Sequence, residues 1–110
     1  MIHVTIYKTK THEYAGFDVE GHAGFAESGQ DIVCAAVSML VINTINSIEQ
    51  LVSDEYTLTS DEEDGVIQFR LSNLSTHDTQ LLLRSMILGL ESLEDNSEYE
   101  PYIDIIFKEV

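Results

Sequence analysis

The sequence predicts an α+β fold in which a five-stranded, largely antiparallel or mixed sheet packs against two helices. Two observations lead to this prediction. Short stretches with period-two alternation of apolar residues, typical of strands, flank two longer stretches with helical periodicity. The elements follow one another in the order β-β-α-β-β-α-β, which favours a sheet covered by helices. Because the chain has 110 residues and is 44% hydrophobic, we expect residues 1–110 to form one domain with a real core.

Two strands open the chain. In residues 2–7 the apolar side chains of Ile2, Val4 and Ile6 alternate with polar ones, as in a half-buried strand. Residues 14–20 alternate in the same way, and a short polar turn lies between the two stretches. We therefore expect a hairpin.

The first helix is expected from residue 31 to about residue 53, after a glycine-rich loop over residues 22–30. Asp31 is the expected N-cap, because its carboxylate can accept hydrogen bonds from the free N–H groups of the first turn. The first half of this helix is apolar nearly all round, so we expect it to be buried on most sides.

Two further strands are expected over residues 56–59 and 66–71. The acidic stretch between them ends in Asp64-Gly65, a pair that favours a hairpin turn. The stretch has two interpretations: a solvated turn, or a site for an ion or a basic partner.

A second helix is expected to start at Ser75, with Asp78 three residues later in an arrangement that resembles a capping box. Its leucine-rich stripe is expected to pack into the core. The polar residues 96–100 are expected to end this helix, and Pro101 prevents it from continuing. A last strand is expected over residues 102–110.

Charge and cysteine content limit the possible functions. The chain has 20 acidic and 5 basic residues, a formal net charge of −15. Such a surface repels phosphate backbones, so we expect no nucleic-acid partner. It either attracts a basic partner or only keeps the protein soluble.

Localisation is expected to be cytoplasmic. The single cysteine allows no disulfide within the chain, and no signal peptide is visible. The longest apolar run, near residues 32–42, is interrupted by Ser38 and is too short to span a bilayer, so we expect no membrane.

The stretch over residues 21–38 carries the candidate chemistry. It contains His22 and Cys34, the only cysteine. With Asp31 as N-cap, Cys34 is the third helical residue, where the helix dipole favours the thiolate, the nucleophilic form of cysteine. A histidine within reach completes the minimal arrangement for nucleophilic catalysis by a thiol. The alternative is that Cys34 is an inert, small core residue.

The blocks Gly21-His22-Ala23-Gly24 and Gly29-Gln30-Asp31-Ile32-Val33-Cys34-Ala35-Ala36-Val37-Ser38 resemble the signature of the bacterial ribosomal-processing cysteine protease family, Prp. The resemblance extends over almost the whole chain. It implies a cysteine endopeptidase that removes a short N-terminal extension from a large-subunit ribosomal protein and so supports ribosome assembly. It also implies that His22 and Cys34 form the catalytic dyad and that a homodimer is plausible.

Other residues of the stretch are assigned supporting roles. Asp31 either caps the helix or orients His22, and capping is favoured. Ser38 lies one turn after Cys34, where it either assists the site or bonds back to a helix carbonyl. Gly21, Gly24 and Gly29 are expected to make residues 22–30 a flexible lid, or only an ordinary connection.

The substrate pocket cannot be placed from sequence. The resemblance implies aromatic residues just before the cleaved bond of the substrate. Side chains that could contact these residues, although more often found in the core, are Tyr14, Phe17, Phe25 and Tyr56.

Two other functions stay open. Cys34 could be a redox-sensing thiol, since such sensors need an accessible cysteine of low pKa. The chain could also be a non-catalytic acidic module that binds ribosomal proteins. We expect no cofactor and no metal, because His22, Cys34 and Asp31 give at most three ligands.

Overall fold

The computed structural model describes residues 1–21, 28–61, 63–73 and 76–110, with residues 28–31 described by their backbone alone. The elements of the described chain are β1 (Ile2–Lys8), β2 (Tyr14–Glu20), α1 (Ser28–Leu51), β3 (Tyr56–Asp61), β4 (Val66–Leu71), α2 (His77–Glu94), a 3-10 turn η1 (Glu100–Tyr102) and β5 (Ile103–Glu109). The predicted order of strands and helices is confirmed.

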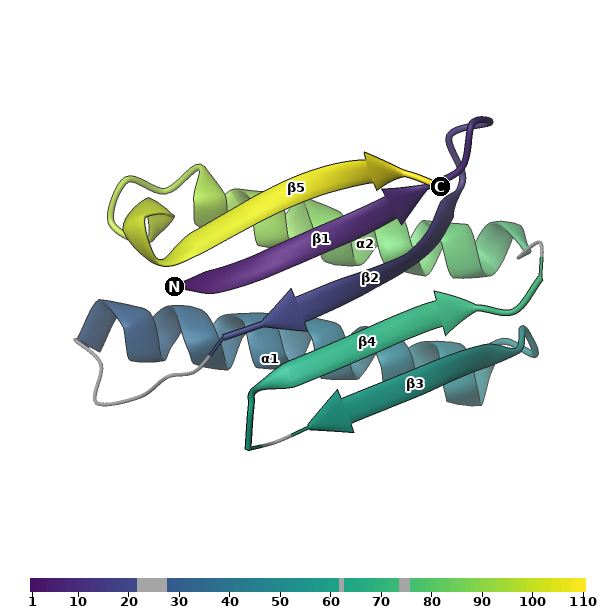
Figure 1. Ribbon diagram of the computed structural model, residues 1–110, viewed down its shortest axis with the longest axis horizontal. Coiled ribbons are helices and arrows are strands. Elements are labelled where there is room, and N and C mark those ends of the chain that lie inside the picture. The colour runs from purple at the N-terminus through teal and green to yellow at the C-terminus, as the bar shows by residue number, and fades with distance from the viewer. Residues whose placement is uncertain (22–27, 62, 74–75) are drawn as a thin grey trace.

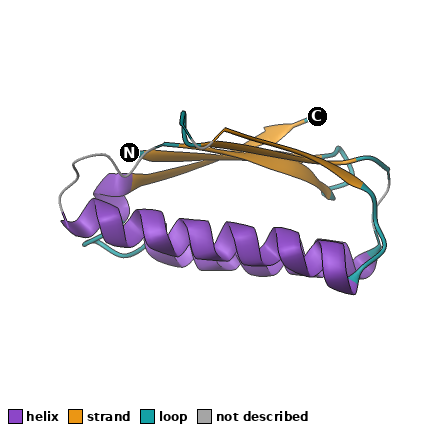
Figure 2. Cartoon of the chain, turned by 90° about the horizontal axis from the view of Figure 1, so that it is seen from below, coloured by secondary structure: helices purple, strands orange, loops and turns teal. Residues whose placement is uncertain are grey.

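The strands form one mixed sheet in the order β3-β4-β2-β1-β5 (Figure 1). The β1–β2, β2–β4 and β3–β4 pairs are antiparallel, and β5 pairs with β1 in parallel. Both helices lie on the same face of this sheet, a point that the sequence alone left open (Figure 2). In the strand order, β3 and β5 stand at the two ends and are the edge strands of the sheet.

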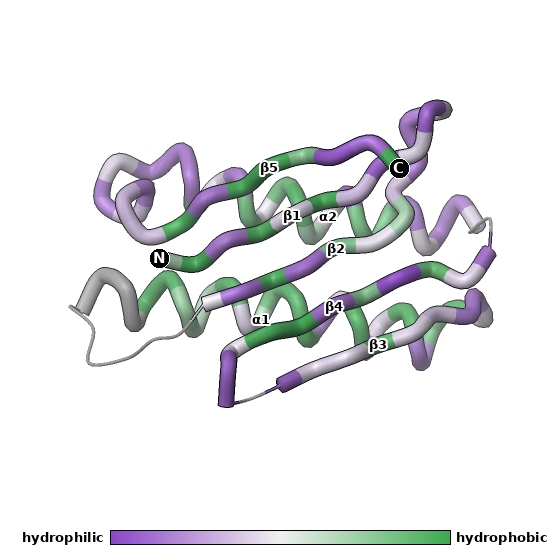
Figure 3. Tube along the Cα trace, in the orientation of Figure 1, coloured by the Kyte–Doolittle hydropathy of each residue, from purple (hydrophilic) through white to green (hydrophobic). Residues whose placement is uncertain are grey.

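The core lies between the sheet and the helices. On β1 the predicted alternation is confirmed, because Ile2, Val4 and Ile6 are at most 2% exposed. The Phe69 ring of β4 stacks on Phe17 and on Tyr56, each at a centroid distance of 5.0 Å. The hydropathy along the chain follows this arrangement, with much of α1 hydrophobic and the strands alternating (Figure 3).

Helix α1 begins three residues earlier than predicted, at Ser28, and ends at Leu51. Gly29 lies in its first turn, so the expected loop over residues 22–30 is too long. A glycine near a helix end costs only about 1 kcal/mol, which the packing of the apolar face of the helix offsets.

Helix α1 also exceeds the apolar run on which the expectation of no membrane rested. The 20-residue segment Ile32–Leu51 is long and apolar enough to cross a membrane by length and composition alone. In this fold it is a helix of the core, because the residues of α1 that face the sheet are buried: Val33, Val37, Val41, Thr44, Ile45 and Ile48.

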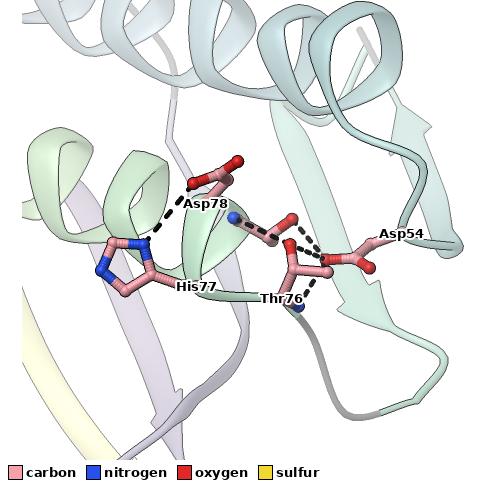
Figure 4. A network of polar contacts seen from close by, with 5 residues as sticks. Asp54, Thr76, His77 and Asp78 are labelled. Atoms are coloured by element: carbon pink, nitrogen blue, oxygen red, sulfur yellow. Dashed lines mark hydrogen bonds and ion pairs between the residues drawn. The ribbon is translucent and has the colours of Figure 1, made fainter.

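Helix α2 is capped by Thr76, and not by Ser75, which lies outside the described residues. The Thr76 side chain accepts a hydrogen bond from the backbone N–H of Thr79. Asp54 fixes this cap from the segment after α1, because its carboxylate accepts from Thr76 N at 2.8 Å, Thr76 Oγ1 at 3.0 Å and Thr79 Oγ1 at 2.5 Å (Figure 4). The long-range contact with Asp54 explains why the local pattern placed the cap one residue too early.

The C-terminal part of the chain differs from the prediction in its bounds. Helix α2 ends at Glu94, before the polar residues 96–100 that were expected to end it. Pro101 lies inside the 3-10 turn η1, where its missing N–H costs no hydrogen bond.

Candidate active site

Cys34 lies on the flank of α1 that faces the β3–β4 side of the sheet, where it is partly buried and lines a pocket of about 300 Å³. The described residues that line this pocket come from α1 and four of the strands or their ends: Ile2, Val19, Gly21, Cys34, Val37, Ser38, Ile42, Ile45, Asn46, Leu58, Ser60, Asp61, Gly65, Val66 and Ile67. Most of them are apolar, and Asp61 is the only charged residue among them. The single cysteine therefore borders a cavity instead of being sealed in the core.

The position of Cys34 in the helix corrects one prediction. Because α1 begins at Ser28, Cys34 is its seventh residue and lies in the second turn, not the third residue of the first turn. The free N–H groups of a helix and the strongest part of its dipole belong to the first turn. The thiol is thus one turn away from the part of the helix that was expected to favour its thiolate form.

Asp31 lies inside α1, so the N-cap role predicted for it is wrong. Its side chain is outside the described part of the structure, and its role as an orienter of His22 stays a prediction.

Gly21 fixes how the chain leaves β2 toward the segment that contains His22. Its φ of 137° lies in a region that side chains other than hydrogen rarely adopt. A Cβ built at this position would lie 2.7 Å from Met1 O and 3.0 Å from the Ile2 Cα. The Gly21 N–H donates to Gly65 O at 3.1 Å, which ties the end of β2 to the start of β4. Gly21 is therefore required for close backbone packing beside the pocket.

The other residues predicted for the site divide into two groups. Ser38 lies on the pocket wall one turn after Cys34, on the same flank of the helix, as the spacing predicted. His22 and Gly24 lie outside the described residues, so the contact between His22 and Cys34 stays a prediction.

The three aromatic candidates within the described residues, Tyr14, Phe17 and Tyr56, do not line the pocket. Phe17 and Tyr56 stack on Phe69 in or beside the core, and Tyr14 packs near Lys8, whose Nζ lies 5.3 Å from its ring centroid. Phe25 lies outside the described residues. Among the described residues, the pocket walls are aliphatic and not aromatic.

The walls contributed by β3 were missed from sequence. Leu58 and Ser60 are separated from Cys34 by more than 20 residues, and only the sheet order brings them beside α1. The one available signal was their period-two spacing, which places both side chains on the same face of a strand.

A second polar cluster lies on the open face of the sheet, away from Cys34. Asp18 accepts from Tyr7 Oη at 2.6 Å and pairs with Arg70 at 2.8 Å between Oδ1 and a guanidinium nitrogen. Burial is the largest influence on the Asp18 pKa and raises it, but hydrogen bonds from Arg70 and Tyr7 outweigh burial, so the pKa lies below its usual value. Asp18 raises the pKa of Tyr7 through their hydrogen bond. This cluster ties β1, β2 and β4 together and does not contact the pocket.

Comparisons with known proteins give the family. A family model described as cysteine protease Prp matches residues 1–104. The chain belongs to the Prp cysteine protease family. The ribosomal processing cysteine protease Prp of Bacillus subtilis (strain 168) is 36% identical over 98 residues, which cover 86% of this chain and 88% of that protein.

Solved Prp structures share the fold. The Staphylococcus aureus ribosomal processing protease Prp in complex with a substrate peptide has a TM-score of 0.90 and 29% identity, with 98% of this chain and 100% of that chain covered. The same protease with a covalently linked product peptide has a TM-score of 0.87 and 30% identity over the same shares of the two chains. This chain is accordingly a cysteine-type peptidase, and a pocket beside its only cysteine is the candidate active site.

Proposed function

We propose that this Prp family member cleaves a short N-terminal extension from a large-subunit ribosomal protein, with Cys34 as nucleophile and His22 as general base and acid. The observation that carries the proposal is the position of Cys34 on the wall of an apolar pocket. The name of the Bacillus subtilis relative supports ribosomal processing. The net charge of −15 favours a basic substrate.

The reaction needs no cofactor. His22 takes the proton of the Cys34 thiol, and the thiolate sulfur attacks the carbonyl carbon of the scissile bond. The C–N bond then breaks, the leaving amine takes the proton from the His22 imidazolium, and a thioester remains on Cys34. Water activated by His22 hydrolyses the thioester and restores the thiol. The Staphylococcus aureus structure with a covalently linked product peptide is consistent with such an intermediate.

Supporting roles follow for two residues. We propose that Ser38, on the pocket wall one turn after Cys34, positions the substrate or His22. We propose that Asp31 orients His22. A Ser38→Ala variant is then expected to lose less activity than Cys34→Ala, because it removes no group that forms a bond to the substrate.

The test is cleavage of a synthetic N-terminal peptide of a large-subunit ribosomal protein, followed by mass spectrometry. Wild type should make a single cut, whereas Cys34→Ala and His22→Ala should make none. His77→Ala is the matched control for His22, because His77 is exposed at the start of α2, away from the pocket. Cleavage by Cys34→Ala at the wild-type rate would disprove the proposal. An intact peptide with the wild type would support the redox or binding alternative.

We also propose that two copies pair through the outer surface of the helix layer. Four large apolar side chains are at least half exposed there: Ile32, Met39, Leu81 and Leu88. On each helix they are seven residues apart, so each pair lies on one side of its helix. In analytical ultracentrifugation the wild type should sediment as a dimer and the double variant Met39→Glu, Leu88→Glu as a monomer. A monomeric wild type would contradict the pairing.

We propose a cytoplasmic location. It is supported by the single cysteine, which allows no disulfide within the chain.

A further inference from the structure

We infer that the substrate binds as an extended strand added to the free edge of β3, with an apolar side chain in the groove between β3 and α1. This inference rests on the proposed function and specifies the substrate class: an extended, apolar segment with a basic residue near Asp61.

The edge of β3 is available for pairing. Within the described part of the chain, β3 pairs only with β4, and five of its six residues are exposed. Every second residue of an edge strand directs its backbone N–H and C=O away from the sheet, toward a peptide that adds as a further strand. Such strand addition is a common way to bind extended peptides.

The groove runs along this edge toward the cysteine. One wall is the flank of α1 from Cys34 through Ser38 to Ile42, and the other is formed by Leu58 and Ser60 of β3. Strand β3 ends on the side of the molecule where α1 begins, so its last residues lie near the Cys34 end of the helix (Figure 1).

The length of the groove matches a short peptide. Ile42 is eight positions after Cys34 in the helix, which corresponds to about 12 Å along the helix axis. An extended chain covers about 3.3 Å per residue, so about four substrate residues span this distance. A strand that pairs with β3 therefore reaches the thiol with a segment a few residues long.

The side chains that line the groove favour an apolar substrate residue and a basic one. Ile42 and Leu58 face it from opposite walls and are 49% and 45% exposed, so an apolar side chain between them would bury both. Asp61, at the end of β3, is the only charged residue among the described lining residues. A lysine or arginine is favoured there, because the chain as a whole is strongly acidic.

The opposite edge of the sheet does not offer the same site. Strand β5 is the other edge strand, and none of its residues is among the described residues that line the Cys34 pocket. Ile106 on β5 is 43% exposed, nearly the same as Leu58. It therefore provides a matched control.

The first experiment measures binding of N-methylated peptides to the Cys34→Ala variant, so that no cleavage occurs. The peptides carry one methyl group each at successive backbone nitrogens of the cleaved segment. Strand addition predicts that affinity falls about tenfold or more at every second position and little at the positions between, since only alternate N–H groups donate to β3. Equal effects at successive positions would overturn the inference.

The second experiment compares Leu58→Lys with Ile106→Lys in wild-type cleavage assays. Leu58→Lys should raise KM about tenfold, because it removes an apolar wall of the groove, with a smaller effect on kcat. Asp61→Asn should raise KM for a peptide with lysine near the cut and leave KM for a norleucine analogue unchanged. Equal KM values for Leu58→Lys and Ile106→Lys, with cleavage intact, would refute the binding mode while leaving the protease function standing.

Discussion

Gly21→Ala tests whether the close backbone packing at the end of β2 is required beside the active site. At its φ of 137° an alanine is strained, which costs of the order of 1–3 kcal/mol. The added Cβ would also lie 2.7 Å from Met1 O, a backbone atom that cannot move away alone. We expect a loss of about 2–4 kcal/mol in the free energy of unfolding, short of the 5–15 kcal/mol typical of a whole domain.

Gly89→Ala is the matched control. Its added Cβ would meet Leu40 Cδ2 at 2.9 Å, but this is the end of a flexible side chain. Alanine is favoured over glycine in a helix by about 1 kcal/mol, which offsets the shift of the leucine. We therefore expect its stability to stay within about 1 kcal/mol of wild type.

Urea unfolding and kcat/KM should be measured on both variants. Gly21→Ala should lose activity even where it is fully folded, because residue 22 follows the changed backbone directly. A Gly21→Ala protein with wild-type stability and wild-type kcat/KM would refute the reasoning, since neither the strain nor the contact with Met1 would then matter.

Three further predictions concern stability and are all read from unfolding curves. Asp54→Ala should lower the free energy of unfolding more than Glu55→Ala does, because the cap of α2 loses the carboxylate that accepts its hydrogen bonds. Equal losses in the two variants would contradict the role of Asp54. Phe69→Ala should lower the free energy of unfolding by about 3–5 kcal/mol, because the ring is fully buried between two others. A loss below about 1 kcal/mol would contradict its place in the core. The folded-state pKa of Asp18 lies below its usual value, so the stability that Asp18 contributes is present above that usual value and is lost as pH falls through the folded pKa. Asp18→Asn should therefore be less stable than wild type near pH 7 and should lose less stability below about pH 4. If the variant and wild type lost the same free energy of unfolding on acidification, this role of Asp18 would be contradicted.

The strands were predictable from sequence because their signal is local. Ile2, Val4 and Ile6 alternate with polar residues, and burial of one face follows directly from that pattern. The start of α1 was not predictable from Gly29 and Asp31, because a turn-forming residue near a helix end costs less than the packing of the helix provides.

The candidate site could be predicted only in part. The motif located Cys34 and the helical spacing located Ser38, since both lie on one continuous helix. The opposite wall depends on the strand order, which places β3 at the sheet edge beside α1, and no local pattern encodes that contact. The cap of α2 was missed for the same reason, because Asp54 reaches Thr76 from a segment 22 residues away.

The most direct test of Cys34 as the catalytic nucleophile is the intact mass of the protein after rapid acid quenching of its reaction with a ribosomal-protein N-terminal peptide. Acyl transfer to the thiol predicts a species heavier than the protein by the mass of the upstream peptide fragment less one water, with the added mass mapped to Cys34. The Cys34→Ala variant should show no such species. Cleavage with the added mass on another residue, or cleavage by Cys34→Ala, would contradict the assignment of Cys34.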